Sequence, residues 1–99
     1  MKLTEKQRRH LRGLAHPLQP VVRIGQAGLG AGVIAETDRA LTDHELIKVK
    51  VQGADRDARD LMLAELAQRT GACLVQRIGH VAVLYRARTE PPQIVLPAN

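Results

Sequence analysis

The spacing of hydrophobic and polar residues near the start of this 99-residue chain is that of an amphipathic helix. The predicted helix runs from about Thr4, a residue type favoured as an N-cap, to Ala15. A narrow stripe on one side of it, which should dock on the rest of the protein, consists of Leu3, Leu11 and Leu14. The opposite side is basic and carries Lys2, Lys6, Arg9 and Arg12, with Arg8 nearer the edge. Glu5 should pair with Arg8 or Arg9 at helical spacing.

Two further helices are expected downstream. One follows a glycine-rich stretch and runs from about residue 30 or 31 to residue 41. The other has Asp55 as its N-cap, Arg69 in its last turn and Gly71 just past its end, as helix C-termini prefer. The residues of this helix that should face inward are Ala58, Leu61, Met62 and Leu66.

Four short segments have the β-branched or alternating character of strands. They span residues 21–24, 46–51, 73–78 and 81–86. In the second of these, Ile47, Val49 and Val51 should face one way while Lys48 and Lys50 face the other. The last two strands are joined by the two residues 79–80, a Gly-X link that predicts a hairpin with a type II′ turn.

The order of these elements, α-β-α-β-α-β-β, predicts an α/β two-layer sandwich built on a four-stranded mixed sheet. Strands separated by helices should be parallel through right-handed crossovers, and the closing hairpin adds an antiparallel strand. We expect the helices on one face of the sheet and an open second face. Arg23, Lys48 and Lys50 should project from that open face, joined by Arg77 or Arg86. Residues 1–88 are interpreted as one domain, and residues 89–99 as a Pro-containing, extended C-terminal tail that packs back or pairs weakly.

The charge is concentrated at one end of the sequence. The net charge is +5, and residues 1–12 contain five basic residues and one acidic residue. This asymmetry favours a polyanionic partner, although a solvated basic surface is the simpler alternative. The chain has no Phe or Trp and a single aromatic residue, Tyr85, so it lacks the aromatic platform that stacks single-stranded bases. Any nucleic-acid contact should therefore be to backbone and shape.

A glycine-rich loop between the first predicted strand and the second helix carries the strongest functional signal. Four glycines fall within the eight residues 25–32. Such a turn brings backbone N–H groups to a helix N-terminus, where the helix dipole also favours a phosphate. Residues 25–28 read Gly-Gln-Ala-Gly and fit the GxxG spacing of loops that clamp a nucleic-acid backbone. The alternative is a tight turn that needs glycine for its conformation.

The sequence gives little support to an enzyme or a metalloprotein. The four histidines are scattered without metal-ligand spacing, and His44–Glu45 is better explained by capping or surface roles than by acid–base chemistry. A phosphate-binding GxxxxGK[ST] motif is absent, and we expect no cofactor. Cys73 is the single cysteine and should be a small buried hydrophobic residue. A signal peptide and a membrane-spanning stretch are not recognisable, so a cytoplasmic location is expected.

Several sequence blocks, taken in order, resemble the CRM domain, specifically the small bacterial YhbY-like proteins. They are Leu11–Leu18 (LRGLAHPL), Ile24–Leu29 (IGQAGL), His44–Val51 (HELIKVKV), Thr70–Ala72, Val75–Gly79 (VQRIG) and Val83–Arg86 (VLYR). The resemblance implies a fold similar to the C-terminal domain of translation initiation factor three. It also implies RNA binding, association with precursors of the large ribosomal subunit, and contacts through the glycine loop and its basic surroundings. The family commonly has Lys after the first glycine and often Thr at position 30, where this chain has Gln26 and Gly30.

These observations lead to the hypothesis of a monomeric, non-enzymatic RNA-binding protein that assists assembly of the large ribosomal subunit by contacting its ribosomal RNA. The expected RNA-binding residues are Gly25, Gln26, Ala27, Gly28, Lys2, Lys6, Arg8, Arg9, Arg12, Arg23, Lys48 and Lys50. The alternative is a protein-interaction module that docks on a ribosomal protein or an assembly factor, with its positive charge incidental.

Overall fold

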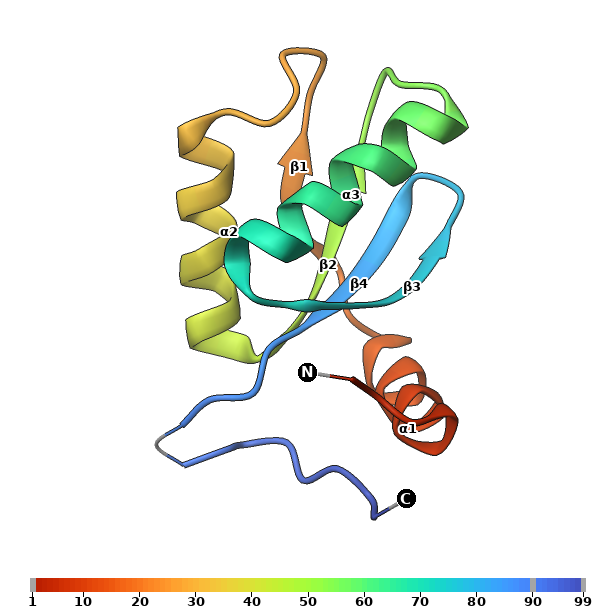
Figure 1. The fold of residues 1–99 in the computed structure, drawn as a ribbon, viewed down its shortest axis with the longest axis vertical. Coiled ribbons are helices and arrows are strands. Elements are labelled where there is room, and N and C mark those ends of the chain that lie inside the picture. The colour runs from red at the N-terminus through yellow and green to blue at the C-terminus, as the bar shows by residue number, and fades with distance from the viewer. Residues whose placement is uncertain (1, 90, 99) are drawn as a thin grey trace.

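The computed structural model describes residues 2–89 and 91–98, and within them the chain forms three helices and four strands (Figure 1). The elements, in chain order, are α1 (Glu5–Ala15), β1 (Pro20–Ile24), α2 (Ala31–His44), β2 (Leu46–Val51), α3 (Arg56–Thr70), β3 (Cys73–Ile78) and β4 (Val81–Tyr85). This is the predicted α-β-α-β-α-β-β order, with strand bounds that differ from the expectation by at most one residue.

The strands form a mixed sheet in the order β1-β2-β4-β3. β1 and β2 are parallel, as expected for strands joined through a helix, whereas β4 pairs antiparallel with both β2 and β3. Ile78 lies opposite Val81, so two residues link the hairpin. Gly79 has φ +59°, the conformation that glycine supplies at the first position of a type II′ turn.

Local signals set the helix ends. The Thr4 hydroxyl accepts a hydrogen bond from Gln7 N, and the Gln7 side chain accepts one from Thr4 N, which completes a capping box. The Asp55 carboxylate caps α3 through Ala58 N, and Gly71 ends that helix with φ +71°. α2 continues three residues past the predicted Leu41. Its end is set by residue 45, which has a left-handed φ of 64°.

One hydrophobic cluster lies between the sheet and the helices α2 and α3. It includes the predicted inward residues Ile47, Val49 and Val51 of β2. Leu63 and Leu66 face this core from α3. The expectation that Leu61 also points inward is wrong, because its side chain is 73% exposed. Leu63, two positions after Leu61, is buried in the core instead.

A second hydrophobic cluster covers part of the opposite face, so the prediction of all helices on one face is wrong. Leu11 and Ala15 of α1 pack there against Leu46, Val83 and Tyr85. These strand residues make the second face apolar at one end, and a sheet that is apolar on both faces requires cover on both. Leu14 is 42% exposed, so Leu3, Leu11 and Ala15 form the docking stripe instead of the predicted three leucines.

The C-terminal tail packs back on this second face, as the sequence allowed, and its described residues form no strand. Ile94 and Leu96 contact the cluster beneath α1. Figure 1 shows the tail running beside α1.

Candidate nucleic-acid interface

α1 covers only one end of its side of the sheet and leaves a basic strip uncovered. Val22 and Ile24 are buried against α2 and α3, so Arg23 between them projects from the opposite side. Its neighbour across the parallel ladder is Lys50, and Lys48 lies two residues before Lys50 on the same side. Arg23 is exposed and both lysines are half-buried. The predicted clustering of these three cations is therefore correct.

A groove separates the end of α1 from the sheet beside this strip. Its volume is about 280 Å³, and it is lined by Arg12, Ala15, His16, Lys48, Gln76, Ile78, Val81 and Val83. Lys48 Nζ donates a hydrogen bond of 3.1 Å to the His16 carbonyl oxygen and so ties β2 to the end of α1. The groove adds Arg12 to the three cations of the sheet. We call Arg12, Arg23, Lys48 and Lys50 together the basic face.

The glycine loop continues the basic face, because it begins directly after β1. Gly28 N donates to Gly25 O at 3.0 Å, which closes a turn, and Gly28 has φ +77°. The turn already uses the Gly28 amide as a donor, so a phosphate near Gly28 would be bound by other backbone amides of the loop. Gly25 does not have a positive φ, and a Cβ at this position would meet no atom within 4 Å. Neither its conformation nor its surroundings therefore require glycine. The two glycines of the GxxG spacing thus have different structural roles.

The Gln26 side chain lies against the neighbouring turn between β2 and α3. A Cβ built on Gly53 would come within 2.8 Å of Gln26 Cγ, and Gly53 has φ +76°. The loop and the β2–α3 turn are thus packed together at the end of the sheet where the parallel strands finish. Gln26 makes this packing contact at the position where the resemblance to the CRM domain led us to expect Lys.

The N-terminus of α2 follows the loop with its first-turn amides uncapped by any side chain. Gly30 is the N-cap and makes no side-chain cap hydrogen bond, in line with the missing threonine at that position. The first turn of α2 contains no acidic residue. The amides of a first helical turn have no acceptor within the helix, and the helix dipole makes this end partly positive.

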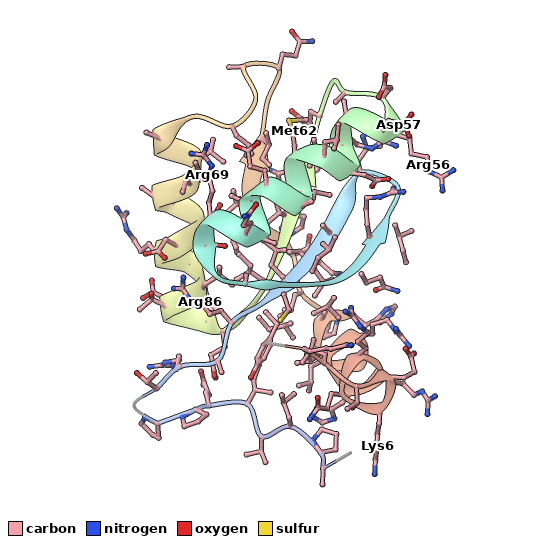
Figure 2. The ribbon with its side chains drawn as sticks, viewed as in Figure 1. Lys6, Arg56, Asp57, Met62, Arg69 and Arg86 are labelled. Atoms are coloured by element: carbon pink, nitrogen blue, oxygen red, sulfur yellow. The ribbon has the colours of Figure 1, made fainter. Side chains whose placement is uncertain are left out.

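The basic side chains of the α1 region do not lie on one common surface. Arg8 Nη1 donates to the carbonyl oxygens of Leu74 and Val75, at 2.8 and 3.1 Å, and fastens α1 to β3. Glu5 pairs with Arg12 at 3.1 Å and with neither of the predicted partners. Lys2 and Arg9 are exposed, and Figure 2 shows Lys6 pointing away from the sheet at the opposite end from the β1–α2 loop. The structure therefore brings Arg12, but not Lys6, together with the strand cation Lys48.

Arg77 and Arg86 do not join the basic face, contrary to expectation. Arg77 pairs with Asp60 of α3. The Arg86 guanidinium donates to the Asp38 carboxylate at 2.6 Å and to Thr70 O at 2.7 Å, and it joins the middle of α2 to the end of α3 (Figure 2). Arg77 lies on the α2–α3 side because the register shift between Leu74 and Gln76 reverses the alternation of β3. Arg86 follows Tyr85, the last residue of β4, whose side chain is on the α1 side.

Sequence reasoning missed the walls of the groove. His16 and Gln76 line it although neither stood out in the sequence. The signal was indirect: the apolar residues Val83 and Tyr85 on the second face indicate that an element must cross it.

Tyr85 itself is 1% exposed, and burial, followed by the nearby charges of Glu45 and Cys73, raises its pKa above 10.0. The single aromatic side chain is therefore unavailable for base stacking.

The described residues hold no group of three His, Cys, Asp or Glu side chains that could bind a metal ion. Within the same part of the chain, no helix is both long enough and apolar enough to cross a bilayer.

The sequence profile of the CRS1/YhbY (CRM) domain matches residues 3–86. The chain belongs to the CRM domain family. The match begins ahead of α1 and ends just after β4, so this CRM domain includes all seven elements described above, the glycine loop and the basic face.

Relatives of this CRM domain share nearly its whole length. A protein of Haemophilus influenzae named as an RNA-binding protein is 52% identical over 95 residues, which cover 96% of this chain and 95% of the relative. A Bacillus subtilis protein named as a probable RNA-binding protein is 42% identical and covers 96% of this chain and 99% of its own. These names are those of RNA-binding proteins and not of enzymes, in agreement with the non-enzymatic reading of the sequence.

A solved structure has the same fold. The solution structure of a hypothetical Staphylococcus aureus protein, regarded as a candidate RNA-binding protein, matches with a TM-score of 0.84 and 40% identity. The match covers 97% of this chain and all of that one, so the common fold extends over the full arrangement described here.

Proposed function

We propose that this CRM domain binds RNA through its basic face and the adjoining glycine loop. The observation that carries the proposal is that Arg12, Arg23, Lys48 and Lys50 lie on one side of the sheet, and that the loop after Arg23 and Ile24 leads to the uncapped N-terminus of α2. Cations and helix N-termini both favour phosphates, which an RNA backbone presents in a row. The RNA-binding names of the relatives agree with this reading.

The contacts should be to the RNA backbone and to its shape. Arginine and lysine read phosphates without regard to sequence, and no exposed aromatic side chain is present to stack an unpaired base. One phosphate of the RNA would approach the loop residues Gly25, Gln26 and Ala27 and the first-turn amides of α2. The basic face would contact the phosphates that come next along the RNA backbone. Lys2, Lys6 and Arg9 would supply long-range attraction, and Arg8 would act mainly by holding α1 on the sheet.

We further propose that the RNA is ribosomal and that the protein, as a monomer, assists assembly of the large ribosomal subunit. The resemblance to the bacterial YhbY-like proteins supports this step. The test is the sedimentation of the tagged protein from a cell lysate on a low-salt sucrose gradient. Co-migration with large-subunit precursors rather than with mature ribosomes is expected, and a profile confined to free protein would contradict the assembly role.

Nuclease treatment of the same lysate separates this proposal from a protein-docking role. Association through RNA should disappear when the RNA is digested. Association that survives digestion would favour docking on a ribosomal protein or an assembly factor instead.

A further inference from the structure

A buried carboxylate outside the basic face holds the C-terminal tail in place. Glu45 is 0% exposed and has the left-handed φ of 64°, which side chains other than glycine rarely adopt. Its Oε1 accepts hydrogen bonds from the backbone amides of Gln93 and Ile94, at 2.7 and 2.8 Å. Its Oε2 accepts one from Arg88 N at 3.0 Å. We call this set of three hydrogen bonds the Glu45 clasp.

The hydrogen bonds of the Glu45 clasp satisfy a buried charge and are therefore more than an incidental contact. A buried carboxylate is costly unless hydrogen bonds compensate for the lost hydration, and here three amide donors do so. All three donors come from residues 88–94, beyond the end of the CRM match at residue 86. The carboxylate of Glu45 thus binds a segment beyond the residues that the family profile matches.

The clasped tail reaches α1. Past the clasp, Ile94 and Leu96 pack on the cluster in which Leu3, Leu11 and Ala15 of the α1 region meet apolar residues of the sheet. Gln7 Nε2 donates to Pro97 O at 3.1 Å, close to the start of α1. The tail therefore runs as a strap from the end of β4 to the N-terminal turn of α1 (Figure 1).

The position of α1 in turn sets one wall of the basic groove. Arg12 and His16 at the end of α1 line this groove, and the His16 carbonyl oxygen accepts the hydrogen bond from Lys48. A shift of α1 would move Arg12 relative to Lys48 and Lys50, whereas Arg23 and Lys50 keep their mutual position through the β1–β2 ladder.

We propose that Glu45 is a positioning residue for RNA binding, which acts through the strapped tail to hold α1 and its Arg12 in line with the strand cations. This inference rests on the proposed RNA-binding function. It assigns a role to a buried residue and to a tail that do not themselves contact the RNA.

A double-mutant experiment with a fluorescein-labelled RNA hairpin tests the proposal. Glu45→Gln keeps the shape of the side chain but turns an amide NH₂ toward a backbone donor, so the clasp loses acceptors. Since this change also removes a negative charge, which alone would strengthen RNA binding, the matched control is Glu36→Gln at an exposed position of α2. We expect Glu45→Gln to weaken hairpin binding by about threefold to tenfold relative to Glu36→Gln, the range of a coupling of this kind.

The decisive readout is coupling to Arg12. Arg12→Ala should weaken binding clearly when Glu45 is present and have little effect in the Glu45→Gln background. Arg23→Ala should cost the same in both backgrounds, because β1 does not depend on the strap. A loss of stability alone would change the effects of Arg12→Ala and Arg23→Ala on RNA affinity to the same extent. Equal effects of Arg12→Ala in both backgrounds would overturn the proposal.

Hydrogen exchange tests the same link without RNA. Glu45→Gln should speed amide exchange in α1 more than in α3. If Glu45→Gln does not fold, Leu96→Ala loosens the strap from its other end and should give the same pattern. Unchanged protection of α1 in the folded variant contradicts the proposal, whereas failure of the unmutated protein to bind the hairpin contradicts the RNA-binding function alone.

Discussion

Lys48 Nζ donates a hydrogen bond of 3.1 Å to the carbonyl oxygen of His16, and this contact joins the middle of β2 to the C-terminal end of α1. The same lysine lies on the sheet beside Lys50, which makes no such contact within the described residues. A residue of the basic face is therefore also part of the attachment of α1. The pair allows binding and stability to be separated by experiment.

Lys48→Ala should lower both stability and RNA affinity, while Lys50→Ala should lower affinity alone. The lost Lys48 hydrogen bond is solvent-accessible, so its removal should reduce the free energy of unfolding by about 0.5–1 kcal/mol. Urea denaturation and hairpin titration of the two variants provide the comparison. Equal unfolding midpoints for both variants would mean that the contact with His16 does not stabilise the fold.

The two glycines of the loop should respond differently to alanine. Gly28→Ala places a Cβ at φ +77°, so we expect a loss of about 1–2 kcal/mol in stability. Gly25→Ala meets open space at an ordinary φ and should leave thermal stability unchanged or slightly higher. Gly25 is therefore the cleaner position for testing the RNA contact of the loop. If Gly25→Ala binds the hairpin as the unmutated protein does, the loop is a turn and not a phosphate site.

Arg86 should matter for folding and not for binding. Arg86→Ala leaves the Thr70 carbonyl oxygen, Asp38 and Thr42 without their common donor, at a cost of about 1–3 kcal/mol. Arg86→Lys should recover little of this, because an ammonium group cannot replace the two-sided guanidinium fork. Thermal unfolding measures the loss. Weakened RNA binding by a fully folded Arg86→Lys variant would place this residue in the interface after all.

The pKa of Tyr85 makes stability sensitive to alkaline pH. Burial first, and then the charges of Glu45 and Cys73, raise that pKa above 10.0, so the folded state holds the phenolic proton more tightly than the unfolded chain. The resulting stabilisation is fully present below pH 10 and is lost as pH rises through the folded-state value. Since Tyr85 is the single tyrosine of a chain without tryptophan, tyrosinate absorbance follows it alone.

Glu45→Gln should lower the Tyr85 pKa, because it removes one of the negative charges that oppose ionisation. The value should stay above that of an exposed tyrosine, since burial is the larger cause. Titration of the unmutated protein with an ordinary tyrosine pKa would show that water reaches the phenol in solution.

Much of the fold could be predicted because its signals are local. The caps at Thr4 and Asp55, the glycine at position 71 and the alternation of Leu46–Val51 each act within a few residues. The side of the sheet on which α1 docks could not be predicted in this way. It depends on the path of the linker between Ala15 and Pro20 and on apolar residues of β4 far along the chain.

The candidate site was predictable to the extent that strand alternation determines it. Arg23, Lys48 and Lys50 share a side because each alternates with buried residues of its own strand. The role of Glu45 could not be read from the sequence, because its three partners lie 43–49 residues away and are backbone amides without a sequence signature. Arg8 likewise read as a free cation, although its acceptors are the carbonyl oxygens of β3.

The most direct test of the basic face is the salt dependence of hairpin binding for Lys50→Ala and for Arg39→Ala, which removes the same charge from an exposed position of α2. Each phosphate contact contributes about 0.7–0.9 to the slope of log affinity against log salt concentration. We predict that Lys50→Ala weakens binding and reduces the slope by about one contact, while Arg39→Ala leaves both nearly unchanged. Equal losses in the two variants would show that net charge alone governs binding and would contradict a defined RNA-binding face.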